Sequence, residues 1–188
     1  MMSYDVTLDD HRSVVVFPDP GDGVTWVCVA DDRAPRIAAF RGIESYPHDD
    51  RWRLPASFRP AGPAETTATV KRSRPGDTRD YLMPRAGYLT VEVDGARYEL
   101  EVSLHGPERT PNINFRDASS GVDSYPAGRF LVLPGDPRDI TTVDLNEAFL
   151  PPCAFNPLIS CPLPPPSNVL GTAVRAGQRH IRWDPPQP

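Results

Sequence analysis

Hydrophobic and polar residues alternate along much of this chain with a period of two, which is the spacing of β-strands that bury one face. Residues 88–93 are the clearest case, because leucine or valine occupies every second position. Asp94-Gly95 is the two-residue turn signal of a hairpin, and residues 97–104 supply its second strand. We expect one face of this hairpin to be apolar and the other to be solvated.

Further short runs rich in β-branched and aromatic residues lie between proline and glycine breaks. They predict strands at residues 14–17, 24–29, 51–58, 65–71, 80–83, 129–133, 140–145, 172–175 and 180–183. The first two runs, joined by the turn 18–23, predict an N-terminal hairpin, and the last two predict a final strand pair. Residues 34–40 predict a short helix. About ten short, mostly antiparallel strands are typical of an all-β barrel or sandwich.

Composition agrees with a single β-rich domain. The 24 prolines and 13 glycines among 188 residues favour turns and irregular loops over long helices. A chain of this length can form one domain with a sizeable core. We expect residues 1–34 to form a strand hairpin packed on the core, residues 35–183 to form the β-rich core domain, and residues 184–188 to be a disordered tail.

The proline segment, residues 149–166, contains two of the three cysteines of the chain, Cys153 and Cys161. Proline fixes φ and lacks an amide donor, so this segment is predicted to be a defined irregular loop, neither helix nor interior strand. Seven residues separate the cysteines, unlike the pairs of structural zinc sites, and we predict no metal. A disulfide and a nucleophilic thiol are both left open, although a reducing compartment disfavours the disulfide. Cys28 is predicted to be a small buried hydrophobe.

Charge and the absence of known motifs exclude several classes of function. A formal net charge of −5 disfavours binding to nucleic acid or to anionic membranes, because both require a basic surface. The first residues lack an export leader, and no stretch approaches the ~18 apolar residues of a membrane span. We therefore predict a cytoplasmic protein. Glycine-rich phosphate loops and common hydrolase motifs do not occur, so no cofactor is expected.

Arg116, Asp117, Tyr125 and Arg129 lie within fifteen positions and form a candidate site for an anion. Arginine offers a planar fork to carboxylate or phosphate, aspartate can orient that fork, and tyrosine adds a hydroxyl group. The alternative is a buried Arg–Asp pair that only ties two loops together.

Asp144 and Asn146 end a predicted strand and should project from the same face. They run directly into the proline segment, so they could form the rim of a pocket. Capping of local backbone amides is an equally good interpretation.

Four segments carry a resemblance to a known family: Phe115-Arg-Asp-Ala-Ser-Ser-Gly121, Ser124-Tyr-Pro-Ala-Gly-Arg-Phe-Leu131, Val143-Asp-Leu-Asn146 and Pro151-Pro-Cys-Ala-Phe-Asn-Pro-Leu-Ile-Ser-Cys-Pro-Leu-Pro-Pro165. They resemble the uncharacterised prokaryotic family DUF1684 over residues 36–180. The resemblance implies a β-rich single domain without an established activity, and its pattern also includes Asn168. The chain departs from that pattern at Glu147, Ser167 and Gln178.

These observations support a small-molecule-binding β-rich domain for an anionic or polar ligand. The predicted ligand-binding residues are Arg116, Asp117, Tyr125, Arg129, Asn146 and Asn168, with Cys153 and Cys161 as structural residues of the loop. One alternative is a hydrolase or lyase in which Asp117 or Asp144 is the base and an arginine assists. The other is a purely structural or interaction protein. The sequence leaves the oligomeric state open.

Overall fold

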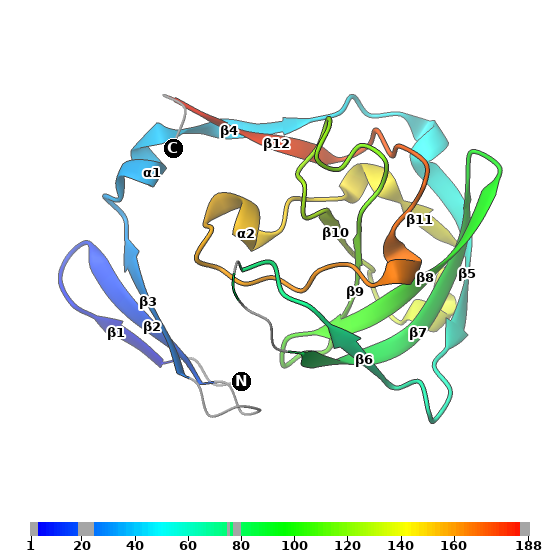
Figure 1. The fold of residues 1–188 in the computed structure, drawn as a ribbon, viewed down its shortest axis with the longest axis horizontal. Helices are drawn as coiled ribbons and strands as arrows, with labels where there is room; N and C mark the ends of the chain where they lie inside the picture. Colours follow the sequence, from blue (N-terminus) through cyan, green and yellow to red (C-terminus); the bar gives the residue numbers. More distant parts are fainter. Residues whose placement is uncertain (1–3, 19–24, 75, 77–79, 185–188) are drawn as a thin grey trace. The chain divides into compact units, whose positions relative to one another are not determined.

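The computed structural model describes residues 4–18, 25–74, 76 and 80–184, and it confirms the predicted all-β class (Figure 1). The chain divides into two compact units. One contains the described residues up to Gly42 together with residues 182–184, and the other contains Ile43–Ile181. The proposed packing of the N-terminal hairpin on the core stays a prediction.

The smaller unit contains a three-stranded antiparallel sheet of β1 (Tyr4–Thr7), β2 (Arg12–Pro18) and β3 (Thr25–Asp31), followed by α1 (Pro35–Ala39). The predicted N-terminal hairpin is β2 paired with β3, and the predicted short helix is α1; both are confirmed. The tip of the hairpin, residues 19–24, lies outside the described residues. Cys28 on β3 is exposed, so the prediction of a buried thiol there was wrong.

The last strand, β12 (Gln178–Trp183), pairs with β4 (Phe40–Ser45). The predicted final pair of residues 172–175 with residues 180–183 was therefore wrong. Residues 172–175 are irregular, and their backbone serves a buried side chain: the Val174 carbonyl oxygen accepts a hydrogen bond from Arg129.

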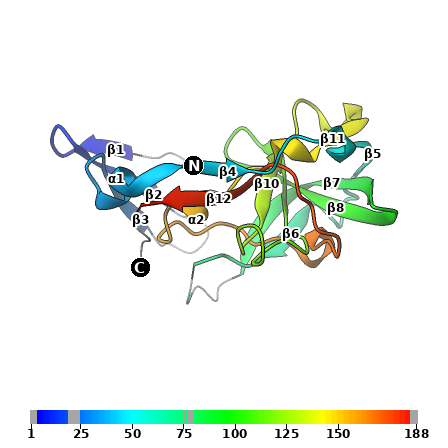
Figure 2. The ribbon, with the colours of Figure 1, turned by 90° about the horizontal axis from the view of Figure 1, so that it is seen from above.

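The larger unit is built on one seven-stranded antiparallel sheet. Its strands are β5 (Arg53–Pro60), β6 (Thr67–Val70), β7 (Tyr81–Val93), β8 (Ala96–His105), β9 (Thr110–Phe115), β10 (Arg129–Val132) and β11 (Thr142–Asp144). Six of them follow the order β10-β9-β8-β7-β5-β11, and β6 pairs separately with β7. Figures 1 and 2 both show β7 and β8 side by side as the longest strands of this curved sheet.

The β7–β8 hairpin has the predicted strands and turn. Leu89 pairs with Leu100 and Val93 with Ala96, while Asp94 and Gly95 have φ of 47° and 78°, as a type I′ turn requires. The apolar side chains of this hairpin enter the main core. That core also includes Trp52, Val91, Val102, Ile113, Phe115, Leu131, Leu145, Val174 and Ala176.

The remaining elements are short: 3-10 turns η1 (Asp50–Trp52), η2 (Pro137–Asp139), η3 (Leu145–Glu147) and η4 (Pro166–Asn168), and one helical turn, α2 (Pro152–Phe155). The proline segment is largely irregular, as predicted, but α2 corrects the expectation that it contains no helix. Pro152 occupies the first turn of α2, where a backbone amide has no helical partner in any case. No helix among the described residues is long and apolar enough to cross a membrane.

Candidate functional site

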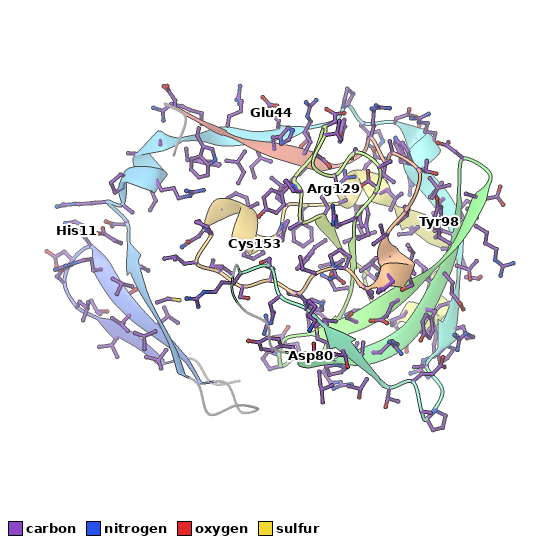
Figure 3. All side chains as sticks on the ribbon, viewed as in Figure 1. His11, Glu44, Asp80, Tyr98, Arg129 and Cys153 are labelled. Carbon is purple, nitrogen blue, oxygen red and sulfur yellow. The ribbon has the colours of Figure 1, made fainter. Side chains whose placement is uncertain are left out.

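Arg129 and Asp117 form a buried ion pair. The side chains are both 0% exposed, and Arg129 Nη2 lies 2.6 Å from Asp117 Oδ2. Arg129 also donates to the carbonyl oxygens of Val174, at 2.7 Å, and of Ala176. Figure 3 shows Arg129 in the interior, away from solvent. These contacts match the structural alternative raised from the sequence, and the ligand-binding roles of both residues stay predictions.

Asp117 connects three parts of the chain around this arginine. Its Oδ1 accepts hydrogen bonds from the amides of Ser119, at 2.8 Å, and Val174, at 3.2 Å. The backbone beside Arg129 is equally constrained, because Gly128 has a φ of +92° and a Cβ there would lie 2.2 Å from the Phe115 carbonyl oxygen. Glycine before the arginine is therefore a steric requirement of this pair.

Arg116 and Tyr125 do not join the buried ion pair. Arg116 is exposed, and its backbone pairs with Val169. Tyr125 is half-buried and packs against a separate cluster that contains Phe130, Cys153 and Cys161. The four residues predicted together from residues 115–129 are thus divided between an interior pair, an exposed position and the cysteine cluster.

Asn146 and Asp144 do lie together, and they organise a turn. Asp144 Oδ1 accepts hydrogen bonds from the Asn146 amide, at 2.9 Å, and from its Nδ2, at 2.8 Å. The Asn146 side chain also bonds the backbone N–H and carbonyl oxygen of Asp49. This is the capping arrangement that the sequence offered as one alternative.

Asn168 is fully buried and bridges β8 and β9 where the two strands diverge. Its Oδ1 accepts from the Glu101 amide at 2.7 Å, and its Nδ2 donates to the carbonyl oxygens of Glu101 and Asn114, each at 3.0 Å. The side-chain amide therefore supplies the hydrogen bonds that a neighbouring strand would supply.

The non-core face of β7, β8 and β9 carries a group of buried and half-buried polar side chains, which we call the polar layer: Arg85, Glu101, Ser103, His105, Asn112 and Asn114. Sequence alternation predicted that this face would be solvated. The structure corrects that expectation, since Glu101, Ser103, Asn112 and Asn114 are all less than 5% exposed. The proline segment covers this face, and Asn114 Nδ2 donates to the Pro162 carbonyl oxygen at 3.1 Å.

The strand register places these side chains next to one another. Arg85, Ser103 and Asn112 are direct cross-strand partners on β7, β8 and β9. Glu101 and His105 lie two positions to either side of Ser103, and residues two apart on a strand share a face. Arg85 and Glu101 form an ion pair within the layer. Five of the six side chains of the polar layer, from three strands, are thus neighbours on one covered surface.

Several polar atoms in and around the polar layer have no hydrogen-bond partner among the described residues. They are Glu101 Oε1, Arg85 Nε, His105 Nε2 and Asn112 Oδ1 on the sheet, with Arg72 Nε and Ser160 Oγ on the covering segments. Native proteins leave only a few buried polar atoms unpaired per 100 residues. Six within one region mark the polar layer as the best candidate for a binding site. Only the Glu-x-Ser-x-His alternation at 101–105 signals it in the sequence.

Burial, together with the positive charge of Arg72, lowers the pKa of His105 below its usual value of 6.5. The unfolded chain therefore binds a proton at this position before the folded chain does. His105→Phe, which can keep the edge-to-face contact with Phe130, should weaken the loss of stability on acidification. We expect the urea midpoint of the wild type to fall more between pH 7 and pH 5 than that of the variant.

The control for this measurement is Leu82→Phe, because Leu82 is exposed and has no titratable group. That variant should keep the pH dependence of the wild type. An identical acid response of His105→Phe and the wild type would show that His105 does not carry this effect.

None of the predicted ligand-binding residues lines either of two surface hollows, although Asn146 hydrogen-bonds Asp49, which lines the first. One, of about 530 Å³, is lined by residues 46–52 and Arg175. The other, of about 520 Å³, is lined by residues that include Phe58, Leu104, Arg109 and Arg138. Arg116, Tyr125 and Arg129 line neither, so the predicted pocket at those residues does not coincide with these hollows.

Comparisons with known proteins identify a family and a similar solved structure. The family model described as a protein of unknown function (DUF1684) matches residues 38–179. The solution NMR structure of an uncharacterised protein from Haloarcula marismortui is 34% identical, with 74% of this chain and 77% of that chain covered and a TM-score of 0.57. None of the curated proteins matches. The family match spans most of the chain, and the protein therefore belongs to the DUF1684 family.

Proposed function

We propose that the larger unit binds a small polar anion at the polar layer, beneath the proline segment. The observation that supports this proposal is the gathering, in one region, of six buried polar atoms that have no hydrogen-bond partner in the described part of the chain. Burying such atoms unpaired costs about 1–3 kcal/mol each, so a fold that retains several of them has a reason to do so. A bound molecule that donates to and accepts from these atoms would recover that free energy.

The charges and donors favour an anion that also carries a hydroxyl group. Arg72 and Arg85 bring two positive charges near the layer, and Glu101 brings one negative charge. Guanidinium N–H groups suit a carboxylate, whereas Glu101 Oε1 and Asn112 Oδ1 accept hydrogen bonds from a hydroxyl. A small hydroxycarboxylate matches this set of donors and acceptors.

The enzymatic alternative gains no comparable support. Asp117 is engaged by Arg129 and two amides, and Asp144 caps η3 and lies 3.7 Å from Arg53 Nε. Roles for these carboxylates as general bases stay predictions, as does the structural alternative.

Asn112→Leu tests the proposed site without removing a charge. The variant should lower the affinity for a small hydroxycarboxylate at least tenfold, which corresponds to about 1.4 kcal/mol. It should also keep or raise the unfolding free energy, by roughly 1 kcal/mol, because an unpaired buried oxygen is lost. Calorimetric titration with glycolate and lactate, and urea unfolding of the same samples, would measure both effects.

The matched control is Arg138→Gln, because Arg138 is 72% exposed on η2 and outside the polar layer. It should change neither quantity. Absence of binding by the wild type to any member of a panel of small carboxylates would contradict the proposal, as would unchanged affinity in Asn112→Leu.

A further inference from the structure

Cys153 and Cys161, both within the proline segment, lie against one another. The Cys153 amide donates to Cys161 Sγ at 3.3 Å, and the residues are 6% and 5% exposed. Both pack with Phe130, and Figure 3 shows Cys153 on α2, on the inner side of the segment. Among the described residues, no third histidine, cysteine, aspartate or glutamate joins them in a group that could hold a metal ion.

Ser73 holds the two cysteines in unequal environments. The Ser73 amide donates to the Cys161 carbonyl oxygen at 2.8 Å, and the Cys161 amide donates to Ser73 Oγ at 2.9 Å. The Ser73 hydroxyl then interacts with the Cys153 sulfur, as does the Tyr125 hydroxyl. Two hydroxyl groups therefore interact with the Cys153 sulfur, whereas the Cys161 sulfur accepts from the Cys153 amide.

These donors favour the thiolate of Cys153. Hydrogen bonds, that from Cys161 first, lower the pKa of the Cys153 thiol despite its burial. The same hydrogen bond, followed by burial, raises the pKa of the Cys161 thiol. Of the two thiols, Cys153 is therefore the more easily deprotonated, and the thiolate is the nucleophilic form of cysteine.

We propose that Cys153 and Cys161 are a reversible dithiol that responds to hydroperoxides, with Cys153 oxidised first and Cys161 closing the disulfide. This inference is independent of the proposed anion site. It rests on the direct contact of the two residues, on the burial of both and on the two hydrogen bonds between Ser73 and Cys161. A hydroperoxide is small enough to suit thiols that are almost buried, whereas a protein disulfide needs an open approach.

The proposed oxidation has two steps. The Cys153 thiolate attacks the distal oxygen of ROOH, the O–O bond breaks, and the departing alkoxide takes a proton to leave as ROH; Cys153 becomes a sulfenic acid. The Cys161 sulfur then attacks the Cys153 sulfur, the S–O bond breaks, and the Cys161 proton leaves with the hydroxyl group as water. Overall, two thiols and ROOH give one disulfide, ROH and water, and a dithiol reductant reverses the change.

The test uses the full chain with Cys28→Ser, which removes the exposed thiol. Hydrogen peroxide at pH 7 should make the tryptic peptide 139–175, which contains both cysteines, lose the mass of two hydrogen atoms, and dithiothreitol should restore it. In the added variant Cys161→Ser, dimedone should label Cys153 as a sulfenic acid. Ser73→Ala should slow the oxidation several-fold, whereas Ser57→Ala, at an exposed position, should not change its rate.

The wild-type chain offers a second test that does not depend on the folding of any variant. Cys153 should react with hydrogen peroxide at least tenfold faster than Cys28, even though Cys28 is the exposed thiol. Faster reaction of Cys28 would overturn the proposal. So would oxidation of Cys153 to a sulfinic acid without formation of the disulfide.

Discussion

Arg129→Met is expected to lower the free energy of unfolding by about 3–5 kcal/mol, the usual effect of removing one partner of a buried ion pair. The variant leaves the Asp117 carboxylate without its counter-charge, and it removes the donors of the Val174 and Ala176 carbonyl oxygens. Thermal unfolding should shift down by roughly 6–20 °C, at about 2–4 °C per kcal/mol for a chain of this size. Calorimetry and urea unfolding would measure the loss.

Two further variants distinguish the effect of the uncompensated Asp117 charge from the general effect of replacing an arginine. Adding Asp117→Asn to Arg129→Met should recover part of the lost stability, because the buried group becomes neutral while its Oδ1 can still accept from Ser119 and Val174. Arg138→Met, at an exposed arginine, should change stability by less than about 0.5 kcal/mol. If Arg129→Met were as stable as the wild type, the ion pair would have no structural role.

Asn168→Leu is expected to destabilise the larger unit by about 3 kcal/mol or more, because it leaves up to three buried backbone groups unpaired at about 1–3 kcal/mol each. These groups are the amide and carbonyl of Glu101 and the carbonyl of Asn114. The size of the side chain is nearly kept, so lost hydrogen bonds should dominate. Urea unfolding measures the global loss, and hydrogen exchange of the Glu101 amide should show local opening between β8 and β9.

Asn156→Leu is the matched control, since Asn156 is exposed and its side chain bonds only the nearby Leu158 amide among the contacts described. It should cost less than about 1 kcal/mol. Normal stability together with normal protection of the Glu101 amide in Asn168→Leu would contradict the bridging role.

The sequence predicts the elements that depend on neighbouring residues. The Asp94-Gly95 turn and the alternation around it specify the β7–β8 hairpin, because the turn geometry and the strand period are both local properties. The β2–β3 hairpin and α1 follow for the same reason. In contrast, β12 pairs with β4 from the other end of the chain, and local patterns contain no information about such a partner.

The candidate site depends on contacts that are distant in sequence, and these were harder to predict. Alternation correctly separates the two faces of β8, but it cannot show that the proline segment covers the polar face and buries Glu101 and Asn112. Likewise, residue types suggested that Arg129 and Asp117 belong together, whereas the carbonyl oxygens that enclose the guanidinium come from Val174 and Ala176. The hydrogen bond between Cys153 and Cys161 required the fold of the segment.

The enclosure of Arg129 affects how the domain can be made. Protein synthesis proceeds from the N-terminus, so Arg129 and Asp117 leave the ribosome well before Val174 and Ala176, which lie 45 and 47 positions after the arginine. Until those residues emerge, Arg129 lacks two of its hydrogen-bond acceptors, and the ion pair remains accessible to water. The nascent sheet can form earlier, but the surroundings of Arg129 are complete only after Val174 and Ala176 have been synthesised.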